Sequence, residues 1–214
     1  RKANLTGLAS DICFEVFSRT PRINNEMINK TLLTLPIHKA RMAIVDRLLQ
    51  TGEGEKIEWE GYGPEVSIYR SMISNKGIDG LHCNGDAGLE DVLHEIDAFV
   101  RTAIGEKQIM TVLYNHLLIA PFGVRKGIIP VYLAYVLRRI EGTVTFYWGD
   151  REFLVNAETL ENVDAEPEKY ALFIDEATED KERYIDALCD FFEVDPTASN
   201  RNSSVVAAMQ RWMR

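Results

Sequence analysis

The sequence is poor in cysteine and has no long apolar run, and these two absences exclude several classes of protein. Three cysteines occur among 214 residues, an odd number at wide spacing. Small secreted domains held by disulfides have denser cysteines, so a reducing, cytoplasmic setting fits better. No apolar run approaches the roughly 20 residues that cross a bilayer, and no signal peptide is evident. We expect a folded cytoplasmic chain that does not enter a membrane.

The sequence also lacks the motifs that identify common catalytic sites. It has no GxxxxGK[ST] phosphate-binding loop, because GEGEK at 52–56 has too few residues between its glycines. It has no GxSxG nucleophile elbow. His82, Cys83 and His94 come nearest to a zinc site, but no further cysteine or histidine lies close to them in sequence. We therefore predict no catalytic residue, no metal and no cofactor, and an enzyme is the third-ranked hypothesis.

Acidic residues outnumber basic ones by 33 to 24, and the excess is concentrated near the C-terminus. Residues 158–195 carry fourteen acids and three bases. Such a block repels phosphate, so the C-terminal third is not expected to bind DNA directly. Asp175, Glu179 and Lys181 have an order that suggests a metal-dependent nuclease, but acids in the first turn of a helix explain it more simply.

Apolar residues recur at helical spacing in several segments. The clearest are 8–17, 37–49, 64–73, 89–104 and 109–117. A short helix is also predicted over 24–29, with Asn24 as its cap, and a strand over 56–59. Cys13 and Cys189 lie among apolar residues of predicted helices, so both thiols are expected to be buried.

Residues 107–156 predict a particular order of elements: two helices around a tight turn, followed by a β-hairpin. Pro121, Gly123 and Gly127 supply the turn, and the second helix runs from residue 129 or 130 to about 140. Residues 143–148 and 151–155 form the hairpin around Gly149-Asp150. A short helix near Asn156 and a strand at 170–174 follow.

This order is typical of a winged helix, and it predicts a mainly α fold: a helical bundle plus a winged-helix-like unit with a two- or three-stranded element. The expected regions are an N-terminal helical region (1–87), the winged-helix-like unit (88–175) and an acidic helical segment (176–214), with a single domain as the alternative. The chain starts without methionine and stops inside an amphipathic run, which suggests a piece of a longer protein.

Winged helices often bind DNA, but the second helix here has few polar positions with which to contact bases. The basic residues of this unit flank that helix or lie on the wing: Arg125, Lys126, Arg138, Arg139 and Arg151. These five side chains would form the contact surface if the unit bound nucleic acid.

A second candidate contact lies where GYGPE begins a helix. Tyr62, Gly63 and Arg70 could contact an anion or a carboxylate of a partner, because the first turn of a helix has free N–H groups. Glu65 competes for the same donors, and capping by Glu65 is the simpler interpretation.

Three segments resemble parts of very large bacterial P-loop ATPases associated with restriction and phage defence, such as the BREX-type ATPases. They are RINNEMINK (22–30), EGYGPEVSIYRSMI (60–73) and LLIAPFGVRKGIIPVYLAYVL (117–137). The resemblance implies a non-catalytic segment of a defence or DNA-transaction ATPase. The absence of a phosphate-binding loop departs from the family's ATPase part, so ATP binding by these residues is not expected.

The leading hypothesis is therefore an interaction or scaffolding module of a larger ATPase-type protein. Its partner would be another domain of the parent chain or a separate protein. The alternative is a winged-helix domain that binds nucleic acid.

Overall fold

The computed structural model describes residues 2–52, 55, 57–176, 179–196 and 201–213. The chain is mainly helical with a small antiparallel sheet of four strands, which confirms the predicted fold class and adds one strand. The helices are α1 (Lys2–Val16), α2 (Leu35–Gln50), α3 (Pro64–Met72), α4 (Ala87–Thr102), α5 (Met110–Leu118), α6 (Ile129–Leu137), α7 (Ala157–Ala165), α8 (Glu179–Phe192) and α9 (Arg201–Trp212). The strands are β1 (Gln108–Ile109), β2 (Thr143–Trp148), β3 (Arg151–Leu154) and β4 (Ala171–Asp175).

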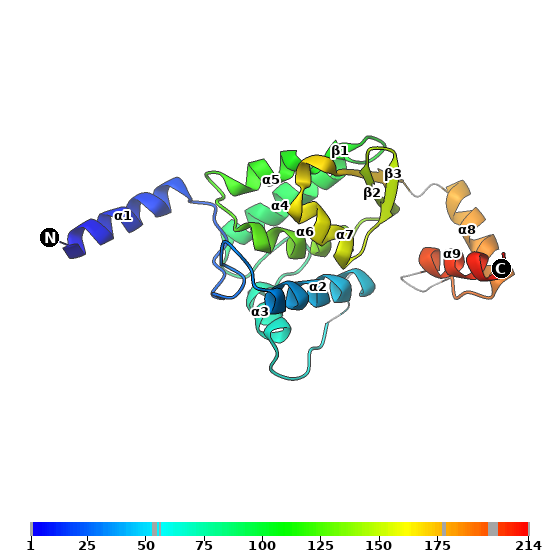
Figure 1. Cartoon of the computed structure of the whole chain (residues 1–214), viewed down its shortest axis with the longest axis horizontal. Helices are drawn as coiled ribbons and strands as arrows, with labels where there is room; N and C mark the ends of the chain where they lie inside the picture. The colour runs from blue at the N-terminus through cyan, green and yellow to red at the C-terminus, as the bar shows by residue number, and fades with distance from the viewer. Residues whose placement is uncertain (1, 53–54, 56, 177–178, 197–200, 214) are drawn as a thin grey trace.

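Residues 19–175 form the body of the molecule, which contains α2 to α7 and the sheet. Figure 1 shows α1 projecting from one side of this body, with α8 and α9 beyond the sheet on the other side. One apolar cluster fills the body and draws buried side chains from Ile23 to Ile174. Cys189 and Val205 are buried outside that cluster, where α8 packs against α9.

The periodic segments form helices because each begins with a suitable residue and buries one face. The Asp86 carboxylate caps α4 by accepting a hydrogen bond from the Leu89 N–H at 3.1 Å. The apolar face of α4 is then fully buried, from Leu89 to Val100. A proline in the first turn of α2 and of α3 fits the backbone angles of a helix start.

α6 is the central helix of the body, and all nine of its residues are buried. It packs against α2, α4 and α7. Its two tyrosines are buried with their hydroxyl groups satisfied, because Tyr132 donates to the Met72 carbonyl and Tyr135 donates to the Gly80 carbonyl, both at 3.1 Å.

The sheet has the strand order β1-β4-β2-β3, and every neighbouring pair is antiparallel. Gly149, with φ at +59°, makes the tight turn of the predicted β2–β3 hairpin. Phe146 of β2 lies between Phe153 of β3 and Leu172 of β4 and is fully buried. The predicted order of helices and hairpin is present, and β4 separates the hairpin from β1.

Three expectations about local structure are wrong. Residues 24–29 form a turn instead of a helix, because the Asn25 side chain accepts from the Met27 N–H and Asn29 donates to the Ile23 carbonyl. Residues 57–59 of the predicted strand are not in a strand, and Lys56 lies outside the described residues. Cys13 is exposed because α1 projects from the body, whereas Cys189 is buried as expected.

Within the described part of the chain, no helix has both the length and the apolar character that crossing a bilayer requires.

Candidate functional site

The five basic residues predicted for nucleic-acid contact are spread over the body. Arg125 and Lys126 are exposed just before α6, whereas Arg138 and Arg139 are half-buried just after it. The nine residues of α6 separate these pairs by about 13 Å along the helix. Arg151 is exposed beside the hairpin turn.

The environments of the two pairs also differ. The Arg138 guanidinium lies 4.6 Å from the centre of the Tyr135 ring, a stacking contact that keeps it against the body. Because all nine residues of α6 are buried, this helix has no exposed face that could enter a groove of DNA. Arg125 and Lys126 remain the most accessible of the five for phosphate.

Reversing the charge of these two residues tests their placement. Arg125→Glu and Lys126→Glu are expected to change the free energy of unfolding by no more than about 0.5 kcal/mol each, because both side chains are exposed. Fluorescence anisotropy with labelled duplex and single-stranded DNA should show weak binding to the wild type over a salt series. Tight binding that weakens steeply with salt and is lost in the variants would instead establish phosphate contacts at this turn.

The predicted anion or partner contact at the start of α3 lies beside a polar cleft of about 470 Å³. Tyr62 and Arg70 line this cleft together with Asn25 and Ser67, and Tyr62 is 98% exposed. Gly63 caps α3, but the Glu65 carboxylate folds back over it: a Cβ on Gly63 would lie 2.0 Å from Glu65 Oε1. The chain's own carboxylate therefore lies beside the start of α3.

α1 has an apolar stripe that no other described element covers. Leu5, Leu8, Ile12 and Val16 lie within an arc of about 80° on the helix. Their exposed fractions are 67%, 57%, 50% and 46%, although side chains of this kind are usually buried in soluble proteins. These four residues are called the α1 stripe below. Sequence periodicity identified the helix but not its exposure.

The segment after α1 fixes the helix to the body. Gly123 has φ at +57°, and the Phe17 ring packs so closely over it that a Cβ there would lie 2.5 Å from the ring. The Arg19 guanidinium lies 4.6 Å from the centre of the Phe122 ring and 2.7 Å from the Asp91 carboxylate on α4. The α1 stripe is therefore presented from an anchored base.

A buried ion cluster joins α2 to α7. The Arg41 side chain is 1% exposed and donates two hydrogen bonds of 2.6 Å to the Glu161 carboxylate. It also contacts Asp164 at 2.9 Å and donates to the Gly127 carbonyl at 3.2 Å, just before α6. Burial lowers the pKa of Arg41, but hydrogen bonds to Glu161 and the charges of both carboxylates outweigh it and raise the pKa above its ordinary value.

The environment of this cluster also shifts the pKa of Asp164. Desolvation by burial raises the pKa of Asp164 more than the Arg41 charge lowers it. The Asp164 Oδ1 atom is buried, and the Asp164 carboxyl interacts with the buried Tyr114 hydroxyl. Because the cluster is enclosed by the body, its role is to join α2, α7 and the start of α6. The sequence contained no signal for it beyond an arginine beside the apolar face of a helix.

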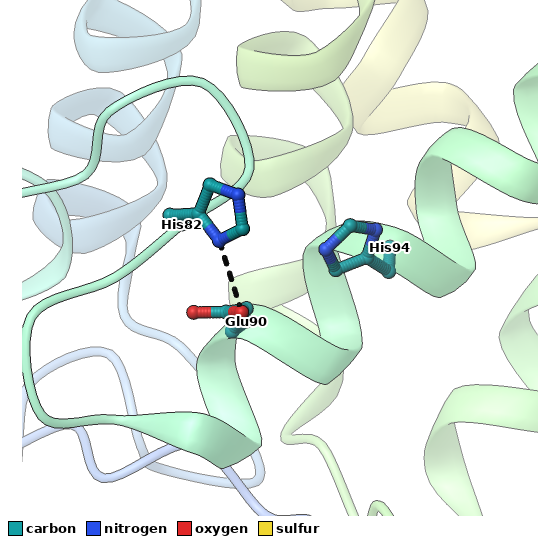
Figure 2. Close-up of side chains that lie close together, drawn as sticks. All are labelled: His82, Glu90 and His94. Atoms are coloured by element: carbon teal, nitrogen blue, oxygen red, sulfur yellow. Dashed lines mark hydrogen bonds and ion pairs between the residues drawn. The ribbon is translucent and has the colours of Figure 1, made fainter.

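From the sequence, His82, Cys83 and His94 came nearest to a zinc site, but the structure brings together a different group of three residues. His82 and His94 approach each other with their ring centres 6.2 Å apart, and Glu90 lies with them, as Figure 2 shows. The Cys83 thiol is not part of this group. Burial, together with the charges of Glu90 and Asp86, raises its pKa to about 11. Glu90 was not among the predicted zinc ligands, which were limited to cysteine and histidine. Its four-residue spacing from His94 is that of neighbours on one helix face.

Comparison with known proteins gives no relative to guide the assignment: no family model, no curated protein and no solved structure matches this chain.

Proposed function

We propose that this chain is an interaction module that binds a protein partner through the α1 stripe. The observation that carries the proposal is the exposure of four aliphatic side chains at helical spacing on an anchored helix. Helices that present apolar residues three, four and seven positions apart bind in apolar grooves of other proteins. The partner is therefore expected to offer such a groove.

Burying the side chains of the α1 stripe would stabilise such an interface. Burying one aliphatic side chain contributes about 1.5–3 kcal/mol, and those of the α1 stripe are about half exposed in the free chain. Part of this gain is offset by the entropy lost on association. The module would then bind with moderate affinity and release its partner, unless further contacts add to the stripe.

Several observations favour a protein partner over nucleic acid. The helix that would contact bases in a winged helix is α6, and it is fully buried. Two exposed basic residues, Arg125 and Lys126, lie just before α6. The α1 stripe, in contrast, is apolar and suits another protein surface.

The proposed context is a segment of a larger ATPase of a DNA-transaction or defence system, in the cytoplasm. This part of the proposal depends on the resemblance of residues 22–30, 60–73 and 117–137. Those segments contribute to the core of the body through residues such as Ile28, Met72 and Leu133. The partner would then be another domain of that protein or a separate member of its complex.

Site-specific photo-crosslinking tests the proposal. A crosslinking residue replacing Leu8 should capture a protein partner, whereas one replacing Phe14, about 120° away from Leu8 around the helix axis and outside the α1 stripe, should not. The captured protein is then purified, and its affinity is measured for wild type, Leu8→Glu with Ile12→Glu, and the control Phe14→Glu. Phe14 is 71% exposed, so the control adds a charge to α1 without touching the stripe.

The expected result is at least about 100-fold weaker binding of the double variant, because charges would be buried in the apolar centre of the interface. The control should bind within a few-fold of wild type. Equal affinity for all three proteins would overturn the proposal. Crosslinks only to a second copy of this chain would replace the proposed partner by self-association, which sedimentation would detect.

A further inference from the structure

We propose that His82, Glu90 and His94 bind one Zn²⁺ ion, with water in the remaining coordination position. One ligand atom from each of the three side chains lies within 4.8 Å of the other two. Two imidazoles and one carboxylate are a common set of protein ligands for zinc, and three such ligands leave one position of a tetrahedral site open. The inference is independent of the proposed protein interface on α1.

Two of the ligands are placed by α4. Glu90 and His94 are four residues apart, so both side chains extend from the same face of the helix. Figure 2 shows the two side chains on the first turns of α4, on the side that faces the loop carrying His82. Because α4 is fixed in the body by its buried apolar face, the spacing of these two ligands is largely set before any metal arrives.

The third ligand is held by a tied loop. His82 and Asp79 exchange two backbone hydrogen bonds of 3.0 Å around a tight turn at Gly80-Leu81. The Gly80 carbonyl accepts from the Tyr135 hydroxyl on α6, and the Asn84 N–H donates to the Lys76 carbonyl. These bonds fix the backbone of the loop, while the His82 ring is 80% exposed and is able to rotate.

The Glu90 carboxylate is already oriented toward the site. Its Oε2 atom accepts from the Cys83 N–H at 3.1 Å, and its Oε1 atom lies 3.1 Å from His82 Nδ1. A carboxylate ligand held by a backbone N–H is the kind of outer support that metal sites use.

Local charge also favours a cation at this position. Two other acids lie close to the site, and each has its own basic partner: Asp86 pairs with Lys76 at 2.8 Å, and Asp91 pairs with Arg19 at 2.7 Å. Glu90 instead faces the two imidazoles. A zinc ion would therefore meet one carboxylate and two imidazoles, without displacing an existing salt bridge with lysine or arginine.

Zinc binding requires only a small movement of the three ligand atoms. Ligand atoms of a tetrahedral zinc site, about 2.0–2.1 Å from the metal, lie roughly 3.3 Å from one another. The widest separation here is at most 4.8 Å, and both histidines are exposed. Rotation of the two rings is enough to close the group without moving α4. Bound zinc would join the loop of residues 77–86 to α4, and its open position could accept a ligand from solution.

Calorimetric titration of Zn²⁺ into the metal-free full chain tests this site. Wild type should bind one equivalent. His82→Ala and His94→Ala should each weaken binding by more than the roughly 10- to 100-fold that loss of an outer support costs. His116→Ala is the matched control, because His116 pairs with Glu95 at 3.0 Å and lies outside the group of three. It should leave the affinity unchanged.

Hydrogen exchange supplies a second readout. Zinc should slow exchange in residues 77–86 of the wild type and of His116→Ala, but not of the other two variants, because the metal closes the loop onto α4. Unchanged zinc affinity in His82→Ala and His94→Ala, an equal loss in all three variants, or no binding by the wild type would each overturn the site. In that case the His82–Glu90 contact is an ordinary surface hydrogen bond.

Discussion

Replacing Arg41 by methionine is expected to lower the free energy of unfolding by about 3–5 kcal/mol. The Arg41 side chain is 1% exposed and pairs with two carboxylates, Glu161 and Asp164. Methionine fills much of the same space but leaves both acids without their cation in a poorly solvated site. Equilibrium denaturation at neutral pH measures the loss. Arg47→Met on the same helix is the control, because Arg47 is exposed and its loss should cost no more than about 0.5 kcal/mol.

A combined variant distinguishes charge from packing. If the loss in Arg41→Met comes from uncompensated charge, then adding Glu161→Gln and Asp164→Asn should recover part of the stability. Desolvation already raises the pKa of Asp164, which indicates that ionising this carboxyl is costly in the body. A triple variant as unstable as Arg41→Met, or less stable, would show that shape and hydrogen bonding of the arginine matter more than its charge.

Replacing Phe146 by alanine is expected to lower the free energy of unfolding by about 3–5 kcal/mol. Phe146 is fully buried on the central pair of strands, with Phe153 of β3 and Leu172 of β4 as its cross-strand neighbours. Alanine would leave a cavity between the sheet and the helices. Thr145→Ala is the matched control, because Thr145 is only half-buried on the same strand and should lose no more than about 1 kcal/mol.

The outcome at Phe146 also tests the topology. In the observed sheet, β2 lies between β3 and β4, so its inward side chain is covered from both sides. If β2–β3 were instead a free hairpin, Phe146 would pack against fewer neighbours and its removal would cost little. A loss below about 1 kcal/mol by thermal or chemical denaturation would contradict the strand order.

The sequence was sufficient for elements whose signal is local. Five of the six buried positions of α4 are apolar, so local spacing predicted a helix over 89–104, and the structure has it at Ala87–Thr102. The β2–β3 hairpin has β-branched and aromatic residues on both sides of Gly149. Such patterns depend on neighbours within one turn or one hairpin, and the fold does not override them.

Features that depend on distant residues could not be predicted. β1 has two residues, and it is a strand only because β4, more than sixty residues later, pairs with it. Arg41 meets Glu161 across 120 residues, so no spacing rule links them. The exposure of the α1 stripe has the same origin: periodicity shows that a helix has an apolar face, but only the fold shows whether another element covers it.

The two proposals differ in how much local sequence could have suggested them. For the zinc site, the Glu90 and His94 pair was visible as a four-residue spacing on a predicted helix. The approach of His82 depends on the loop that Tyr135 holds through the Gly80 carbonyl. For the α1 stripe, sequence alone favoured the opposite outcome, since the same periodicity predicted that Cys13 would be buried, and it is exposed.

Hydrogen exchange of the full chain, free and bound to the partner captured at Leu8, tests the central claim most directly. Protection should increase in residues 5–17, because the α1 stripe becomes enclosed and the helix can no longer open freely. The turn at Arg125 and Lys126 should exchange as before. An unchanged α1, with new protection at residues 125–139 instead, would contradict the account and place the interface on the basic ends of α6.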